Sequence, residues 1–221
     1  MIQPDNNEPQ TYEQQVEGAL LHMEYYGGAV CNLLHDEPVG KGYINVQPVL
    51  NSLIDFFASE GWLLSGTGYF SAVFIRGDLA LKVGLKKEDT GATYAAWCRA
   101  HQGYEGVPVI HRIEKFKNCY LVMTNRYHSV ADRPLSKQMV TERRHLRKVL
   151  EQGEAPQTDV YAARTAAMIR QFFDGIATFD LNTGNLMVDR RGEFVITDPV
   201  SYDHANGNGS YCYTPEITPS G

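Results

Sequence analysis

The chain has 221 residues, of which 43% are hydrophobic and 21% are charged. This length suits a single domain, and this balance is that of an ordinary globular protein. No apolar run reaches the roughly 18 residues that a membrane span needs, and the first residues lack the basic and apolar parts of a signal peptide. We therefore expect a cytoplasmic protein without membrane contact. The net charge of −6 argues against direct nucleic-acid binding, because phosphate contacts need an excess of Lys and Arg.

The four cysteines, Cys31, Cys98, Cys119 and Cys212, are far apart in the sequence. They form neither a CxxC pair nor a cluster with histidines, which argues against a disulfide framework and against a structural zinc site. We expect core thiols in a reducing compartment. The basic cluster at 142–148 is typical of a solvated helix face, and docking to an acidic partner stays open.

Apolar residues recur at helical spacing in the first sixty residues. Residues 11–34 are predicted to form two helices with a break at Gly27 and Gly28, and a further helix follows Pro48 and ends near Gly61. We assign 1–61 to an N-terminal helical extension.

The pattern changes from helix to strand at Trp62. Three strands are expected between there and Val83, then a helix capped by 88–90 and running to about Gln102, then a strand pair at 109–114 and 119–124. The sequence thus predicts an antiparallel sheet of five strands with one inserted helix over 62–127, with Met123 ending the fifth strand.

Two features of this segment point to phosphate chemistry. A Gly66-x-Gly68 turn between antiparallel strands lets backbone N–H groups approach phosphate oxygens without a Cβ in the way. Lys82 lies inside an otherwise apolar strand and must place its ammonium group somewhere polar. Because no helix follows the glycines directly, the pair favours a kinase-type flap over a Rossmann or Walker loop.

The remaining residues, 128–221, are expected to be mainly helical. From Thr158 we predict a helix that ends directly before Asp180, with one apolar stripe made by Met168, Phe172, Ile176 and Phe179. A short hairpin over 186–197, turned at 190–192, then leads to Asp198.

Asp180, Asn185 and Asp198 form the chemical centre of the sequence. An acid, an amide five residues later and a second acid after an apolar hairpin is the arrangement with which phosphotransferases build a base and a magnesium cage.

Taken in order, these features resemble the protein-kinase core over roughly 62–216. The amino-acid sequence at 68–72, 82–92 and 196–201 is similar to that of the early serine/threonine protein kinase of T-odd (T-seven-like) short-tailed bacteriophages. The resemblance implies an α+β, two-lobed kinase-like fold, with the sheet lobe at 62–127 and a reduced C-terminal lobe at 128–221. It also implies the use of ATP and Mg2+ in the host bacterial cytoplasm. The implied substrates are host proteins, namely RNA polymerase, ribonucleases and translation factors. The basic C-terminal extension that acts on host transcription has no counterpart in this sequence.

The resemblance also assigns roles to individual residues. Asp180 would orient and deprotonate the substrate hydroxyl, Asn185 and Asp198 would hold magnesium, and Lys82 would contact the nucleotide phosphates. Glu88 would pair with Lys82, with Asp89 as the alternative. The remaining nucleotide-binding positions would be Gly66, Gly68, Ser71, Val73, Ala80 and Met123.

The sequence departs from the kinase pattern in several places. Thr178-Phe179 replaces the His-Arg that usually precedes the catalytic Asp, Asn182 replaces a Lys, and Pro199-Val200 replaces Phe-Gly. Only 23 residues follow Asp198, so we expect the N-terminal helices, or a second copy of the chain in a homodimer, to supply the packing surface of the reduced lobe.

Two other functions stay open at this point. A small-molecule kinase of the aminoglycoside-phosphotransferase type shares the Asp180, Asn185 and Asp198 pattern. The other alternative is a pseudokinase that binds and blocks a host protein, although the retained Lys82, Asp180, Asn185 and Asp198 argue against it. For the kinase reading we also predict that Ser201, three residues after Asp198, is a self-phosphorylation site whose added charge switches the enzyme off.

Overall fold

The computed structural model describes residues 11–36, 46–68, 71–85, 90–117, 119–132 and 134–202. Three helices open this part of the chain: α1 Tyr12–Leu21, α2 Met23–Asp36 and α3 Val46–Ser59. Thr11 caps α1 through a capping box with Gln14, which satisfies backbone N–H groups that the first turn leaves unpaired.

A five-stranded antiparallel sheet follows these helices, in the order β1-β2-β3-β5-β4. Its only inserted helix among the described residues is α4 Thr90–Ala100, between β3 and β4. This confirms the predicted α+β class, the strand count and the place of the inserted helix. The strands are β1 Leu63–Thr67, β2 Ser71–Arg76, β3 Leu79–Gly84, β4 Ile110–Lys115 and β5 Tyr120–Asn125.

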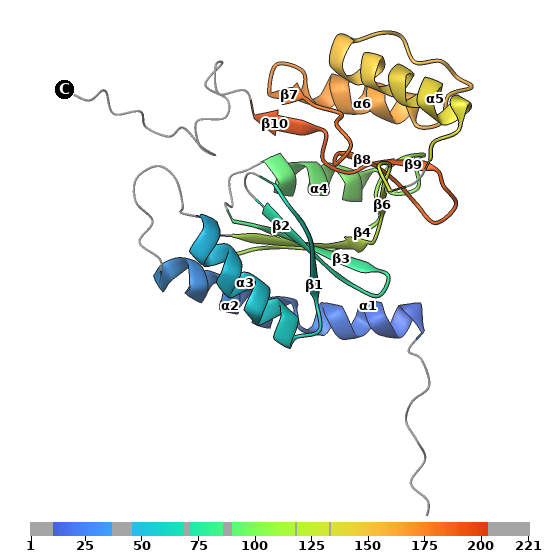
Figure 1. The fold of residues 1–221 in the computed structure, drawn as a ribbon. Helices are drawn as coiled ribbons and strands as arrows, with labels where there is room; N and C mark the ends of the chain where they lie inside the picture. The colour runs from blue at the N-terminus through green and yellow to red at the C-terminus, as the bar shows by residue number, and fades with distance from the viewer. Residues whose placement is uncertain are drawn as a thin grey trace, which may run out of the picture.

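The two faces of the sheet serve different purposes because successive strand residues point to opposite sides. On β3, Leu79, Leu81 and Val83 pack with α1, α2 and α3 in one hydrophobic cluster. Ala80 and Lys82 point to the other face, where a cavity lies. Figure 1 shows the three N-terminal helices below the sheet and α4 above it.

The rest of the chain forms a second body above α4 (Figure 1). Two short sheets, β6-β8-β9 and β10-β7, stand beside two helices. The second hydrophobic cluster joins their buried side chains to the inner face of α4, including Tyr94, Leu146, Ile169 and Phe173. The elements are β6 His128–Ser129, α5 Lys137–Arg147, the π-helical turn η1 Lys148–Gln152, α6 Ala163–Phe173, β7 Ala177–Phe179, β8 Leu186–Val188, β9 Phe194–Ile196 and β10 Val200–Tyr202.

The predicted helix from Thr158 to Phe179 is wrong at both ends. Ala162 has a left-handed backbone (φ 61°), so the helix begins only after it. Gly175 (φ 72°) then turns the chain, and β7 instead of a helix leads to Asp180 because β10 pairs with it. Two members of the predicted stripe, Phe172 and Ile176, are exposed.

The predicted break at Gly27 and Gly28 is also wrong, because α1 ends at Leu21 and both glycines lie inside α2. The N-terminal helices also do not cover the C-terminal body, so a second copy of the chain stays the predicted source of that packing surface. They pack on the opposite face of the sheet, where Met23, Leu53 and Phe57 are fully buried.

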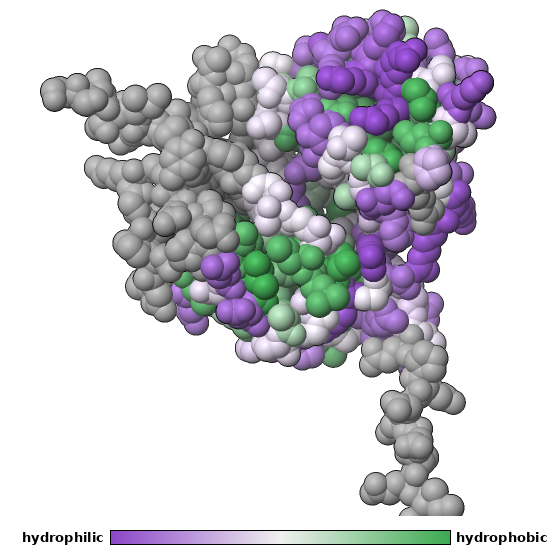
Figure 2. Space-filling model, in the orientation of Figure 1, coloured by the Kyte–Doolittle hydropathy of each residue, from purple (hydrophilic) through white to green (hydrophobic). Residues whose placement is uncertain are grey.

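The surface of the two bodies differs in polarity. Figure 2 shows hydrophilic side chains gathered over α5 and α6 and apolar ones over the sheet half. On β1, the edge strand of the sheet, Leu63 is 66% exposed. Within the described ranges, every helix is too short or too polar to cross a lipid bilayer.

The two neighbouring glycines of α2 provide a matched test of the packing on the sheet. A Cβ on Gly27 would overlap the ring of Phe116, whereas a Cβ on Gly28 would meet open space. Gly28→Ala should therefore raise the free energy of unfolding by about 0.5–1 kcal/mol through helix propensity. Gly27→Ala should lower it by about 1–3 kcal/mol through overpacking. Urea unfolding of both variants measures this, and two shifts of the same sign would contradict this packing.

Candidate functional site

A cavity of about 450 Å3 lies between the sheet, α4 and the 182–198 segment. Its lining comes from both bodies of the molecule, so neither forms it alone. It includes these residues singled out from the sequence: Gly66, Gly68, Ser71, Val73, Ala80, Lys82, Asn185 and Asp198.

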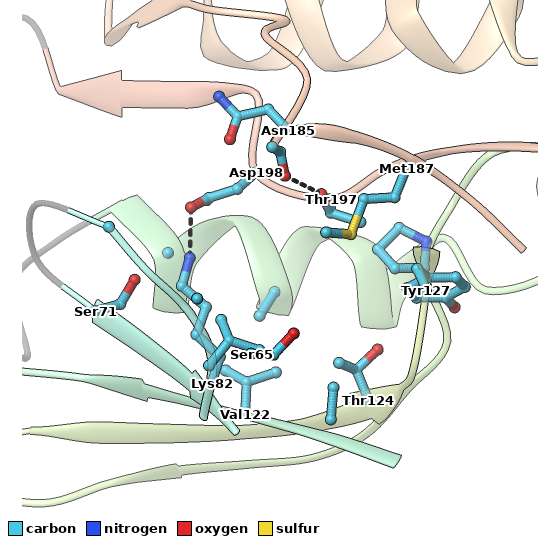
Figure 3. A pocket seen from close by; sticks show the side chains of 18 of the residues that line it. Ser65, Ser71, Lys82, Val122, Thr124, Tyr127, Asn185, Met187, Thr197 and Asp198 are labelled. Carbon is cyan, nitrogen blue, oxygen red and sulfur yellow. Dashed lines mark hydrogen bonds and ion pairs between the residues drawn. The ribbon is translucent and has the colours of Figure 1, made fainter. Parts of the chain in front are cut away.

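The charged centre of this cavity is an ion pair between Lys82 and Asp198. Lys82 lies in the middle of β3, between Val73 and Val122 on the neighbouring strands. Its Nζ donates to Asp198 Oδ2 at 2.6 Å, and Figure 3 shows the lysine reaching up from the sheet toward the carboxylate. The Lys82 side chain is 17% exposed and that of Asp198 is 36% exposed. The pair therefore brings together two residues 116 positions apart.

Helix α4 fixes the segment that carries Asp198. Tyr94 Oη donates to the carbonyl of Ile196 at 2.7 Å, two residues before Asp198. Thr90 Oγ1 donates to the carbonyl of Val200 at 2.9 Å, two residues after it. Both bonds are buried, and burial raises the pKa of Tyr94 well above its usual value, so the hydroxyl keeps its proton as a donor. These bonds hold the backbone of Asp198 from both sides.

The loop from Asp180 to Asn185 is held by its own side chains. Asn182 Oδ1 accepts from the backbone N–H groups of Gly184 at 2.7 Å and Asn185 at 3.1 Å. Its Nδ2 donates to Asp180 Oδ2 at 2.7 Å. Asn185 Nδ2 donates to the carbonyl of Asp180 at 2.9 Å. Asn182, which from the sequence marked a lost positive charge, therefore also orients the Asp180 carboxylate.

A second, smaller hollow of about 300 Å3 places Asp180 beside the ion pair. Lys82, Asn185 and Asp198 line both this hollow and the main cavity, whereas Asp180 and Ser201 line the smaller one. Asp180 is exposed, so a group arriving from solvent can reach its carboxylate.

The Lys82–Asp198 ion pair lies at one end of the main cavity. Lys82, Ser71, Asn185 and Asp198 lie at one end in Figure 3, and Met187 and Tyr127 lie at the other. Ala80, Ile110 and Val122 add apolar surface to the lining. A ligand with a flat apolar ring and a charged tail fits this division.

Asn185 and Asp198 could hold a divalent cation at the end of the cavity that contains the ion pair. The amide of Asn185 donates through Nδ2 to the Asp180 carbonyl, which fixes Oδ1 as the group left to act as a ligand. Asp198 offers a carboxylate in the same cavity. Carboxylate and amide oxygens are ligands that Mg2+ accepts, together with phosphate oxygens.

Not every expected residue reaches the site. The side chain of Met123 is fully buried in the cluster on the opposite face of the sheet, and Val122 and Thr124 line the cavity in its place. The strand also continues past Met123 to Asn125. The first correction follows from strand alternation, since neighbours on a strand face opposite ways. Glu88 and Asp89 lie outside the described residues.

The sequence did not single out several residues that build the site. Nothing in the sequence signalled the bond of Tyr94 to the Ile196 carbonyl. Thr90 was read as part of a helix cap, and its hydroxyl instead reaches β10. Other unforeseen lining residues include Asn125, Arg126, Tyr127 and Met187.

Comparisons with known proteins give one family. A family model described as "Bacteriophage T7 protein kinase 0.7" matches residues 30–215. No curated protein matches the sequence. Among solved structures, the crystal structure of WbdD is similar at 11% identity and a TM-score of 0.35, over 61% of this chain and 31% of WbdD. The Cydia pomonella granulovirus kinase PK-1 is similar at 10% identity and a TM-score of 0.38, over 67% of this chain and 57% of PK-1. The chain thus spans less than a third of the length of WbdD.

A prediction concerns Cys98, which lines the cavity from α4. Burial raises the pKa of its thiol to about 12, so at pH 8 the reactive thiolate is scarce. Iodoacetamide at pH 8 should label Cys98 at least about tenfold more slowly than the partly exposed Cys31. Peptide mass spectrometry over time measures both rates. Equal rates in folded protein would show that Cys98 is accessible and ionised.

Proposed function

This chain belongs to the bacteriophage T7 protein kinase family, and from that premise we propose that it is an ATP-dependent serine/threonine protein kinase. The observation that carries the proposal is the Lys82–Asp198 ion pair at one end of the cavity, with Asp180 beside it. The sheet half and the helical half would act as the two lobes that close on the nucleotide.

The cavity would accept ATP in one orientation. The adenine ring would lie among the apolar residues Ala80, Ile110 and Val122, and the phosphates would lie near Gly66 and Lys82. Asn185 and Asp198 would hold Mg2+, which supplies positive charge to the phosphate oxygens when it is bound. In this role Lys82 would exchange part of its contact with Asp198 for the phosphates.

Asp180 would serve as the base for the acceptor hydroxyl. As the hydroxyl oxygen bonds to the γ-phosphorus, the bond between that phosphorus and the oxygen of the departing ADP breaks, and the hydroxyl proton passes to Asp180. The hydrogen bond from Asn182 to Asp180 Oδ2 would leave the other carboxylate oxygen to meet the substrate.

We also propose that the substrates are bacterial host proteins, among them RNA polymerase, ribonucleases and translation factors, phosphorylated in the host cytoplasm. The resemblance of the sequence at 68–72, 82–92 and 196–201 to early phage kinases supports this choice. The exposed position of Asp180 supports an acceptor as large as a protein.

Asp180→Ala should abolish most of the phosphoryl transfer, with Asp159→Ala as the control. A general base contributes about 10²–10⁴-fold to a rate, so we expect a loss of that size for Asp180→Ala. Asp159 is an exposed carboxylate in a turn and does not line the cavity, so its variant should match the wild type. Radiolabelled ATP with bacterial lysate, resolved on gels, is the measurement.

The same assay separates the competing functions. Many labelled bands in the wild type, lost in Asp180→Ala, support a protein kinase. Binding of ATP without transfer would indicate a pseudokinase. Transfer to an aminoglycoside, with no labelled protein, would indicate a small-molecule kinase.

Self-phosphorylation at Ser201 gives a separate prediction. Ser201 is exposed on β10 and borders the hollow that contains Asp180 and Asp198. A phosphate there would add about −2 of charge beside the proposed metal site and lower the activity. Mass spectrometry after incubation with Mg-ATP should find the modified peptide in the wild type but not in Asp180→Ala. Ser201→Ala should stay active for longer, and an active wild type without modified Ser201 would disprove the idea.

A further inference from the structure

We propose that Glu151 is a positioning residue that fixes the direction of Asp180, and that Arg147 and Arg170 hold Glu151 in place. Glu151 lies in the π-helical turn η1, 29 residues before Asp180 in the chain. The inference rests on the proposed function of Asp180 as the base.

Both carboxylate oxygens of Glu151 are engaged. Oε1 accepts a hydrogen bond from the backbone N–H of Leu181 at 3.0 Å. Oε2 accepts from Arg147 Nε at 2.8 Å, one turn earlier in the chain. The Glu151 side chain is only 19% exposed. A carboxylate bound to a backbone N–H is among the stronger hydrogen bonds in proteins, so this contact is suited to fix a loop.

The bonded N–H belongs to the peptide group that follows Asp180. The carbonyl of that same peptide group, on Asp180, accepts from Asn185 Nδ2 at 2.9 Å. The N–H of Asp180 itself donates to the carbonyl of Pro199 at 2.9 Å. The backbone of Asp180 is thus held on both sides. Two of these bonds come from Asn185 of the loop and from Pro199, which directly precedes β10, and Glu151 of η1 supplies the third. Fixing these peptide planes fixes the direction in which the Asp180 side chain leaves the backbone.

Arg170, on α6, holds the turn from which Glu151 reaches the loop. Its Nη1 donates to the carbonyls of Leu150 at 2.8 Å and Glu151 at 3.1 Å. Its guanidinium also lies over the ring of Phe179, 5.3 Å from the centroid. Arg170 therefore contacts both the turn that carries Glu151 and the residue directly before Asp180. A single π-helical turn is rare and is found often at functional sites.

The arrangement explains how a loop without an arginine before its acid is kept in place. Position 179 is Phe, so the loop itself offers no cation at that point, and Arg170 presents one from the neighbouring helix. Polar contacts from η1 and α6 take over the anchoring of the loop.

The test compares Glu151→Ala, Glu151→Gln and Glu154→Gln. Glu154 lies three residues after Glu151 and serves as the matched control. It makes an exposed ion pair with Lys148 at 2.9 Å. Loss of the Leu181 contact should lower kcat of Glu151→Ala about 10–100-fold, because small displacements of a reacting group have effects of that size. The KM for ATP should stay within about threefold, since Glu151 does not line the nucleotide cavity. The amide oxygen of Glu151→Gln can still accept from Leu181, so this variant should retain more activity than Glu151→Ala.

Hydrogen exchange of the Leu181 amide tests the contact without catalysis. In nucleotide-free protein this amide should exchange at least about tenfold faster in Glu151→Ala than in the wild type, with Glu154→Gln unchanged. Faster exchange together with a selective loss of kcat supports the proposal. An unchanged exchange rate, an unchanged kcat, or a loss in Glu154→Gln equal to that in Glu151→Ala would overturn it. An inactive wild type would instead refute the proposed function, and the exchange measurement would still report on the contact.

Discussion

The ion pair between Lys82 and Asp198 joins the two bodies of the molecule across the cavity, and the site depends on it. Two long-range constraints bring its partners within 2.6 Å. Lys82 is fixed because β3 lies between β2 and β5 in the sheet. Asp198 is fixed because Tyr94 and Thr90 of α4 bond the carbonyls on either side of it. Helix α4 is therefore more than a cover for the sheet, since its buried hydroxyls set the distance between a cation on one body and an anion on the other.

The Asp180 loop follows a different principle. Residues 180–185 form no helix or strand, so their backbone groups need partners from side chains. Asn182 and Asn185 supply some of these from within the loop, and Glu151 supplies another from η1. Polar side chains in this stretch thus have two tasks, because they satisfy the backbone and present oxygen atoms to the cavity. Asn182 stands where a Lys is usual, and its hydrogen bond orients the carboxylate of Asp180. This contact gives the position a function without the positive charge of a Lys.

The sheet could be predicted from the sequence, because strand alternation and turn residues are local signals, and motif spacing together with the resemblance to kinases supplied eight of the residues that line the cavity. Gly66, Lys82, Asn185 and Asp198 all border the cavity as expected. Local signals failed where a distant partner decided the outcome. The chain before Asp180 has helical spacing, yet it forms β7 because β10 is there to pair with it. Met123 was placed by its position near the end of a strand, but its buried side chain faces the N-terminal helices. The glycines of α2 read as a break, although Gly27 is where the ring of Phe116 approaches the helix.

By itself, the sequence determined which chemical groups are present, their order, and the elements that carry them. It predicted a base, an amide and two charged residues on a sheet and a hairpin, because residue type and spacing are properties of a short stretch of chain. Only the tertiary structure decided which of these groups meet and what holds them. The contacts of Tyr94 with Ile196, Glu151 with Leu181 and Arg170 with Phe179 join residues from elements distant in the chain. No periodicity encodes such contacts, since each depends on the packing of whole helices against the sheet and the loop.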